Sequence, residues 1–336
     1  MNGENIRVHV LAGDIGGTTT RLQIAACEGG HCRPLHEQRF ASAAFAQFSA
    51  VLCEFLRNAP AAEIHAACFG VAGPVQPTAG GQFVQVTNLP WQLDSGALAR
   101  EFGIARVRLI NDFQAIGYAI EHLAPEQLLV VQPGEPIVHA PRAVLGAGTG
   151  LGQALLIWQG EHYEVLATEG GHADFGPTDE LTVELSRYLL AHFGHASYEL
   201  ILSGAGLVRL YAFLQEREKA PESATMAEAL RQGDPAAITH AALQDGDPLA
   251  NRVLDLFVRI YGAQAGNLAL SAGATGGVYI AGGIAPIIAS RLETDAFRQA
   301  FRNKGSMSAY AARIPVTIVT DAEPGLAGAR QVALRL

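Results

Sequence analysis

Polar residues whose types suit phosphoryl transfer follow two apolar runs in the first part of the chain. Asp14 follows the run 8–12 and opens the stretch 14–21, in which glycines and threonines offer backbone N–H groups and hydroxyls to phosphate oxygens. The Asp14 carboxylate would then lie near the Mg²⁺ that accompanies a nucleotide. Asn111 and Asp112 follow a later apolar run, where a fixed carboxylate could accept the proton of a hydroxyl that attacks a phosphoryl group. Both residue types are also favoured helix N-caps, so a purely structural role for the pair stays open.

A second glycine-rich stretch, Gly146 to Gly152, also separates two apolar runs. Its spacing is not the GxGxxG of a dinucleotide fold, and the stretch 14–21 is not the GxxxxGK[ST] of a P-loop. Either turn alone is typical of an ordinary hairpin. Together with Gly282 and Gly283, which follow a third apolar run, the two turns predict a cradle for a nucleotide.

Glu169 and His172 flank a pair of glycines, so their side chains can converge on one ligand that the backbone approaches closely. A carboxylate and an imidazole in fixed positions distinguish sugar hydroxyls, because a misplaced hydroxyl leaves a buried polar group unpaired. The alternative is a glycine turn with a solvated glutamate. Glu199, just before the apolar run 200–202, is a weaker candidate for the same cluster, since most glutamates in such places are surface residues.

The order of the expected elements places these residues at strand ends. The first part of the chain predicts strands over 8–12, 22–26, 65–71 and 107–110 and helices over 45–58 and 113–122. The second part begins in the same way, with strands over 143–145 and 154–158 around the second glycine turn, which suggests a duplicated architecture. The later expected elements are helices over 180–193, 207–216, 227–231 and 248–270, a strand over 278–281, a helix from Pro286, a strand over 314–320 and a closing helix over 326–336.

Length and charge restrict the class of protein. At 336 residues, the chain exceeds the size at which one hydrophobic core usually stops growing, so two domains with a cleft between them are expected. The net charge of −9 disfavours nucleic acid and an anionic membrane surface as partners, because both attract basic patches. The uncharged segment 261–290 contains polar residues and many glycines, which predicts a buried helix, a turn and a buried strand rather than a membrane span. The first ten residues lack the apolar core of a signal peptide, so a cytoplasmic protein is expected.

The four cysteines lie in the first fifth of the chain and show no spacing typical of a metal site or of a disulfide scaffold. We therefore expect four reduced thiols in a cytosolic protein. They are Cys27, Cys32, Cys53 and Cys68. Histidines interleave with the first two in what reads as a polar hairpin, and no metal site is expected there.

Six motifs, taken in order, resemble those of the bacterial glucokinase family within the hexokinase and actin-like superfamily. They are LAGDIGGTTTRL, LINDFQAIGYAI, LGAGTGLG, EGGHADFGP, ELILSGAGLVRLY and VYIAGGIAP, and they run colinearly from about Leu11 to Gly328. The resemblance implies an α/β protein with the two-domain actin-like ATPase (ribonuclease H-like) fold and an interdomain cleft. The implied domains are a small one, 1–122 plus 321–336, and a large one, 123–320.

The resemblance also implies an activity and a role for each candidate residue. The expected reaction is transfer of the γ-phosphoryl group of ATP to the 6-hydroxyl of glucose, with Mg²⁺, by a protein that is often a homodimer. The residues expected to hold glucose are Asn111, Asp112, Glu169, His172 and Glu199, with Asp112 as general base. The residues expected at ATP are Asp14, Gly16, Gly17 and Thr18 in the first phosphate turn, Gly146, Gly148, Thr149 and Gly150 in the second, and Gly282 and Gly283 beside the adenosine.

The chain departs from the family pattern at three positions: Thr19 replaces a common Asn, Leu200 replaces a common Arg, and Ala205 replaces a frequent Pro. Two alternative functions stay open, a kinase for a related sugar such as mannose or an N-acetylhexosamine, and a sugar-sensing regulator without turnover. The chain lacks the cysteine-rich zinc motif of the repressor and open-reading-frame kinase relatives, which disfavours the first alternative. Asp112 is retained, which disfavours the second.

Overall fold

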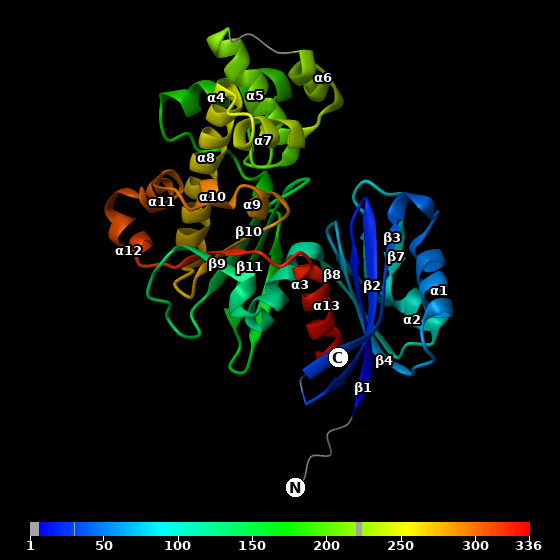
Figure 1. Cartoon of the computed structure of the whole chain (residues 1–336). Helices are drawn as coiled ribbons and strands as arrows, with labels where there is room; N and C mark the ends of the chain where they lie inside the picture. Colours follow the sequence, from blue (N-terminus) through cyan, green and yellow to red (C-terminus); the bar gives the residue numbers. More distant parts are fainter. Residues whose placement is uncertain (1–6, 30, 220–223) are drawn as a thin grey trace. The chain divides into compact units, whose positions relative to one another are not determined.

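The computed structural model describes residues 7–29, 31–219 and 224–336, which fold into two compact units (Figure 1). The first unit comprises Met1–Leu123 and Asp321–Leu336, and the second comprises Ala124–Thr320. Each unit has its own sheet and its own hydrophobic core.

The sheet of the first unit has the strand order β3-β2-β1-β4-β8. Strand β2 pairs antiparallel with both β1 and β3. On the other side of β1, β4 and then β8 are added in the parallel direction. The strands are β1 (Val8–Ile15), β2 (Thr19–Glu28), β3 (His31–Ala41), β4 (Ile64–Val71) and β8 (Arg106–Asn111). Strands β1 and β4 are buried on both faces at their carboxyl halves, as is typical of strands covered on both sides.

Helices and a small second sheet complete the first unit. They are α1 (Phe48–Asn58), α2 (Ser95–Phe102), α3 (Asp112–Ala119), α13 (Pro324–Arg335), β5 (Gln76–Thr78), β6 (Gly81–Gln85) and β7 (Gln92–Asp94). The closing helix α13 packs on β1, β4 and α3. Its approach to α3 requires Gly328, because a Cβ there would lie 1.7 Å from the carbonyl oxygen of Ala115.

The sheet of the second unit repeats the order and directions of the first and adds one strand, giving β12-β11-β10-β13-β14-β9. An antiparallel pair is again followed by two parallel strands, and β9 closes the far edge antiparallel to β14. The strands are β9 (Leu128–Gln132), β10 (Arg142–Ala147), β11 (Leu151–Trp158), β12 (Tyr163–Thr168), β13 (Val278–Ala281) and β14 (Val316–Val319). The duplicated architecture predicted from the two glycine turns is therefore confirmed in the strand topology.

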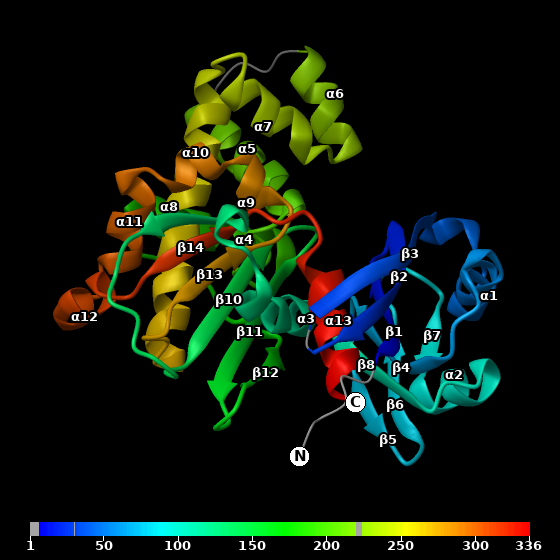
Figure 2. The ribbon, with the colours of Figure 1, turned by 60° about the horizontal axis from the view of Figure 1, so that its bottom comes forward.

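The helices of the second unit are α4 (Glu180–Phe193), α5 (Gly204–Glu218), α6 (Ala224–Gln232), α7 (Pro235–Leu243), α8 (Pro248–Ala272), α9 (Ile284–Ile287), α10 (Ala289–Leu292), α11 (Asp295–Arg302) and α12 (Ser308–Ala312). Helix α8 is buried along most of its length, and α5, α7, α10, α11 and α12 pack against it; it passes behind β13 and β14 in Figure 2. The expectation of one helix starting at Pro286 is wrong. Pro286 lies inside the short α9, and Ile288 leaves the helical region (φ −103°, ψ 19°), so the segment breaks into separate turns of helix.

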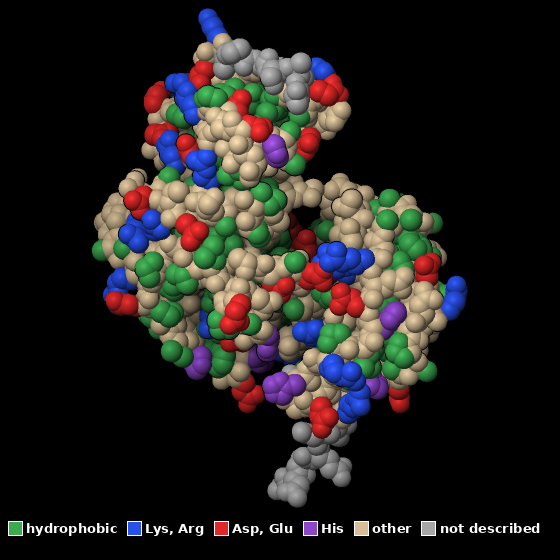
Figure 3. All heavy atoms as spheres, in the orientation of Figure 1, with side chains coloured by type: hydrophobic (Ala, Val, Ile, Leu, Met, Phe, Trp, Pro, Cys, Tyr) green, Lys and Arg blue, Asp and Glu red, His purple; other side chains and the backbone are tan. Residues whose placement is uncertain are grey.

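The uncharged segment 261–290 is confirmed as the buried end of α8, a turn and the buried strand β13. Gly273 ends α8 in the left-handed conformation, with φ of 58°. Among the described residues, none of the helices combines the length and apolar character that crossing a membrane requires. Acidic and basic side chains are interspersed over the face shown in Figure 3.

The prediction of four reduced cysteines is wrong for two of them. Cys27 and Cys32 are register partners in the β2–β3 hairpin and form a disulfide, with their Cα atoms 4.1 Å apart. Their spacing carries no disulfide signature in the sequence, but directly opposite positions of an antiparallel pair bring two side chains into contact. Cys53 and Cys68 are free thiols.

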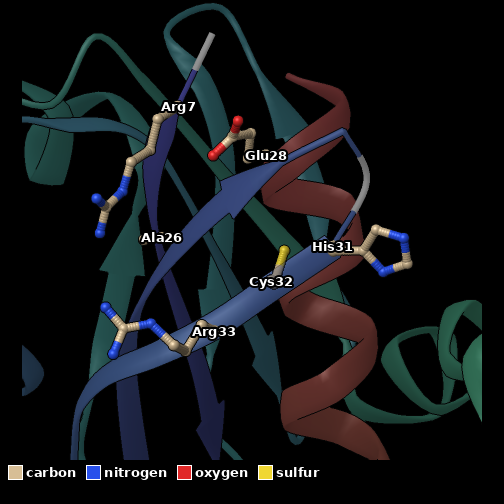
Figure 4. A pocket seen from close by; sticks show the side chains of 6 residues that line it. All are labelled: Arg7, Ala26, Glu28, His31, Cys32 and Arg33. Carbon is tan, nitrogen blue, oxygen red and sulfur yellow. The ribbon is translucent and has the colours of Figure 1, made fainter. Parts of the chain in front are cut away.

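A surface pocket of about 450 Å³ lies at the disulfide end of the same hairpin (Figure 4). Its lining residues are Arg7, Ala26, Glu28, His31, Cys32 and Arg33. In Figure 4, the guanidinium groups of Arg7 and Arg33 project to one side and the His31 ring to the other. The glycine turn 16–18 lies at the opposite end of β2, so this pocket is separate from the candidate phosphate site.

Candidate active site

The candidate residues of the first unit lie at the carboxyl ends of three adjacent parallel strands. Ile15 in β1, Val71 in β4 and Asn111 in β8 are neighbours in register. Asp14 stands at the end of β1, and Asp112 directly follows β8. The topology thus brings the first glycine turn and the Asn111–Asp112 pair to one edge of the sheet, where open α/β sheets bind ligands.

Neutral hydroxyl groups support the first glycine turn. The N–H of Gly16 donates to the carbonyl oxygen of Thr19 at 3.0 Å, which closes the turn. The buried hydroxyl of Ser42 donates to the carbonyl oxygen of Gly16 at 2.9 Å and lies 3.0 Å from the hydroxyl of Thr20. The exposed Thr18 stands at the tip, so the turn presents backbone and hydroxyl groups from a fixed base.

Asp14 lies against the start of α13. A Cβ built on Gly325 would lie 3.3 Å from the Asp14 carboxyl carbon, a tight contact that would require the carboxylate to shift by a few tenths of an ångström. Burial raises the pKa of Asp14 to about 6, while the charge of Arg21 acts to lower the pKa and that of Glu323 to raise it. A carboxylate whose ionised form is this poorly compensated favours a cation beside it, and carboxylate oxygens are ligands that Mg²⁺ prefers.

A row of charges extends sideways from Asp14 across the sheet. Arg21 is the register partner of Asp14 on β2, and Arg39 is the register partner of Arg21 on β3. Glu323, just before α13, contacts both arginines and lies 2.5 Å from Nη1 of Arg21. Neither this row nor Gly325 was predicted from the sequence, because the strand register and the return of the chain end bring together residues about 300 positions apart.

Asn111 caps helix α3, and Asp112 does not. The Asn111 Oδ1 accepts hydrogen bonds from the N–H groups of Phe113 at 2.9 Å and Gln114 at 3.3 Å, and its Nδ2 donates to the carbonyl oxygen of Gly73. Asp112 is the first residue of the helix, partly exposed, and its Oδ1 accepts from the N–H of Phe113 at 2.9 Å. The N-cap alternative therefore applies to Asn111.

The second glycine turn is supported by a charged group. Gly148 to Gly150 join β10 to β11. The carboxylate of Glu199 accepts a hydrogen bond at 3.0 Å from the N–H of Leu151, directly after the turn. The N–H of Gly204, at the start of α5, donates to the carbonyl oxygen of Gly148 at 2.9 Å. The segment from Glu199 to Gly204 therefore holds the turn on both sides.

The predicted sugar residues of the second unit lie around this same segment. His172 Nδ1 is 3.7 Å from the Glu199 carboxylate, and both His172 and Glu169 are exposed. The loop comes so close to the turn that a Cβ on Gly171 would lie 2.1 Å from the carbonyl oxygen of Leu151. The structure thus brings Glu199 and His172 together beside the second turn, so Glu199 is more than the surface residue that its sequence context favours.

Gly282 also meets the second turn. Gly146 is the register partner of Ala281, so the glycine pair 282–283 leaves β13 beside the end of β10. Gly282 has a φ of 82°, and a Cβ there would lie 2.5 Å from the carbonyl oxygen of Ala147. A Cβ on Gly283 would meet no atom within 4 Å, so this position offers open space for a ligand.

Comparison with known proteins gives one consistent family. The family model Glucokinase matches residues 11–336. The glucokinase of Nostoc punctiforme is 41% identical over 342 residues, covering 97% of this chain and 99% of that protein. The glucokinase of Hahella chejuensis is 37% identical and covers 96% of both chains.

Solved structures agree in fold. The crystal structure of glucokinase from an Antarctic psychrotroph superposes with a TM-score of 0.84 at 31% identity, covering 98% of this chain and 99% of that one. A ROK family glucokinase from Streptomyces griseus, solved with glucose and AMPPNP, superposes with a TM-score of 0.65 at 22% identity, covering 98% of this chain and 100% of that one. The second likeness concerns the fold alone, and with the repeated strand order it identifies the actin-like ATPase fold. The match along nearly the whole chain shows that this protein belongs to the glucokinase family.

Proposed function

We propose that this chain transfers the γ-phosphoryl group of ATP to the 6-hydroxyl of glucose, giving glucose 6-phosphate and ADP. The observation that carries the proposal is the match to glucokinases over 97% of the chain. The two glycine turns and the Asn111–Asp112 pair lie within the matched residues, each at a strand end that suits its task.

In the proposed mechanism, Asp112 accepts the proton of the 6-hydroxyl as the hydroxyl oxygen attacks the γ-phosphorus. Asn111, held by its capping bonds, would orient the same sugar edge. Glu169, His172 and Glu199 would hold the remaining hydroxyls, since a carboxylate accepts hydrogen bonds that an imidazole can donate.

We propose that Gly16, Gly17 and Thr18 bind phosphate oxygens in one turn and that Gly146, Gly148, Thr149 and Gly150 bind them in the other, with Gly282 and Gly283 beside the adenosine. Asp14 fits a Mg²⁺ that accompanies the nucleotide, because burial leaves its negative charge undercompensated. When bound, Mg²⁺ neutralises charge that develops on the phosphate oxygens.

We further propose that the two compact units act as a small domain (1–122 plus 321–336) and a large domain (123–320), with substrates in a cleft that glucose closes. Small-angle scattering tests the closure, and an unchanged radius of gyration at saturating glucose contradicts it. A cytoplasmic homodimer is proposed from family membership alone. Light scattering of the purified chain tests the dimer, and cell fractionation tests the compartment.

A coupled phosphorylation assay over a panel of sugars and donors tests the function. We expect the highest kcat/KM with glucose and MgATP. A higher kcat/KM with mannose or an N-acetylhexosamine would assign the chain to another sugar. Binding of glucose without turnover would instead indicate a sugar-sensing regulator.

A further inference from the structure

Glu199 stands at the junction between the predicted sugar cluster and the second phosphate turn, and its contacts with the turn are at least as close as those with the cluster. Its Oε2 accepts from the N–H of Leu151 at 3.0 Å, whereas its Oε1 is 3.7 Å from His172 Nδ1. The fit against the turn is tight, because a Cβ on Gly150 would lie 2.5 Å from the same Oε2. The carboxylate thus occupies the space that a side chain at position 150 would need.

The backbone around Glu199 is fixed on both sides, so its side chain is aimed at the turn by more than one contact. The N–H of Glu199 donates to the carbonyl oxygen of Gly171 at 2.9 Å. Its own carbonyl oxygen accepts from the hydroxyl of Ser203 at 2.8 Å, and that hydroxyl also caps α5. The next residue along, Gly204, donates to the carbonyl oxygen of Gly148. The loop 169–172, the residue Glu199 and the second glycine turn, 148–150, are therefore joined by hydrogen bonds within the second unit.

We infer that Glu199 is a positioning residue for the second phosphate turn as well as a sugar ligand, and that it couples glucose binding to nucleotide binding. The inference rests on the proposed function for the identity of the two ligands. A sugar hydroxyl that donates to Glu199 changes the charge density on the oxygen that holds the N–H of Leu151. The two ligands then share one group, and by thermodynamic reciprocity each changes the affinity for the other by the same factor.

The test is nucleotide binding in the absence of sugar, because a group that serves only the sugar has no effect there. The probe is the Mg²⁺ complex of AMPPNP, titrated calorimetrically into the full-length chain. A hydrogen bond to a charged group is lost in Glu199→Ala, so we expect the affinity for this probe to fall about tenfold or more without sugar. The matched control is His172→Ala, which removes a neighbour in the sugar cluster and should leave sugar-free affinity for the probe within about twofold.

Two further variants separate positioning from misfolding. Glu199→Gln keeps an oxygen that can accept from the N–H of Leu151, so its sugar-free affinity for AMPPNP should lie closer to the parent than that of Glu199→Ala. Gly150→Ala places a methyl group against the Glu199 carboxylate. The resulting loss of affinity for AMPPNP should be smaller in the Glu199→Ala background, so the double-mutant cycle should be non-additive.

Parent-like affinity of Glu199→Ala for AMPPNP without sugar overturns the inference, and so does an additive cycle. Both readouts use nucleotide binding alone, so they stand even if glucose is not the substrate. Failure of the proposed function would appear separately, as absent glucose phosphorylation by the parent chain.

Discussion

The turn at residues 16–18 and the turn at residues 148–150 occupy the same place in two sheets of the same strand order, but different groups support them. The first rests on the buried and neutral hydroxyls of Thr20 in β2 and of Ser42, which directly follows β3. The second rests on the Glu199 carboxylate and on the start of α5. The same topology is thus supported by neutral hydroxyls in one unit and by a carboxylate, which we propose also binds the sugar, in the other.

The difference extends to the polar residues beside each turn. The first unit places two carboxylates at its sheet edge, Asp14 against a helix terminus and Asp112 at the start of α3. The second unit places a carboxylate and an imidazole together, with Glu199 shared between the sugar cluster and the turn. We therefore propose that charge handling and proton transfer fall mainly to the first unit, and that the second unit contributes most of the sugar contacts beside Asn111.

Removing the proposed base is the severest test of this division. Asp112→Asn keeps the size of the side chain and an oxygen that can accept from the N–H of Phe113, while Asn111 continues to cap α3. General-base catalysis typically contributes about 10²–10⁴-fold, so kcat in a coupled assay should fall by that order while glucose affinity changes much less. The melting temperature serves as the folding control. A kcat within about tenfold of the parent would remove Asp112 from the proton-transfer role.

Asp14→Asn should lower activity with MgATP and at the same time raise the stability of the fold. Loss of a charged ligand should lower kcat/KM for MgATP by about 10- to 100-fold, with little change in the KM for glucose. The same substitution removes a buried charge that the fold compensates poorly, so the variant should resist urea better than the parent at pH 8. Equal KM increases for both substrates would contradict a role confined to the nucleotide.

The stability gain has a defined pH dependence. The folded protein binds the Asp14 proton more tightly than the unfolded chain, since the pKa of Asp14 is raised to about 6. This group therefore makes the free energy of unfolding decrease as the pH rises from about 4 to about 6, with no further change above that range. The stabilisation of Asp14→Asn over the parent should grow across the same range and reach at most about 3 kcal/mol. A difference that is the same at pH 5 and pH 8 would contradict the burial effect.

His172→Ala tests the proposed sugar contacts of the second unit, and the expected change in kinetic constants is smaller. One hydrogen bond to a sugar hydroxyl contributes about 0.5–1.5 kcal/mol, so the KM for glucose should rise about two- to tenfold while the KM for ATP stays near that of the parent. Steady-state kinetics with each substrate varied in turn supplies both constants. If the ATP constant rises as much as the glucose constant, His172 does not belong to the sugar side.

The sequence predicted the elements and the chemical types better than the contacts between them. Both glycine turns, the helix after Asp112 and the buried segment 261–290 were readable because local pattern and strand ends determine them. The disulfide between Cys27 and Cys32 could not be predicted from the sequence, because the register of the hairpin decides which residues face each other. Ser42, which supports the first turn, lies in none of the recognised motifs. Gly204 lies within the motif ELILSGAGLVRLY, but its hydrogen bond to Gly148 depends on a position that only the tertiary fold defines.

Ser42→Ala should have the smallest effect and tests whether the first turn is as independent as its neutral support implies. The substitution leaves the Gly16 carbonyl oxygen and the buried Thr20 hydroxyl without this partner, so we expect unfolding to cost about 1–3 kcal/mol less and the KM for ATP to rise about threefold. Thr20→Val is the matched control, because it removes a hydroxyl from the same pair but keeps the bond from Ser42 to Gly16. It should lower stability, measured by urea unfolding, and leave the KM for ATP close to the parent value. If Thr20→Val raises that KM as much as Ser42→Ala does, the turn is sensitive to general packing rather than to the single bond that holds Gly16, and the contrast with the Glu199-supported turn is lost.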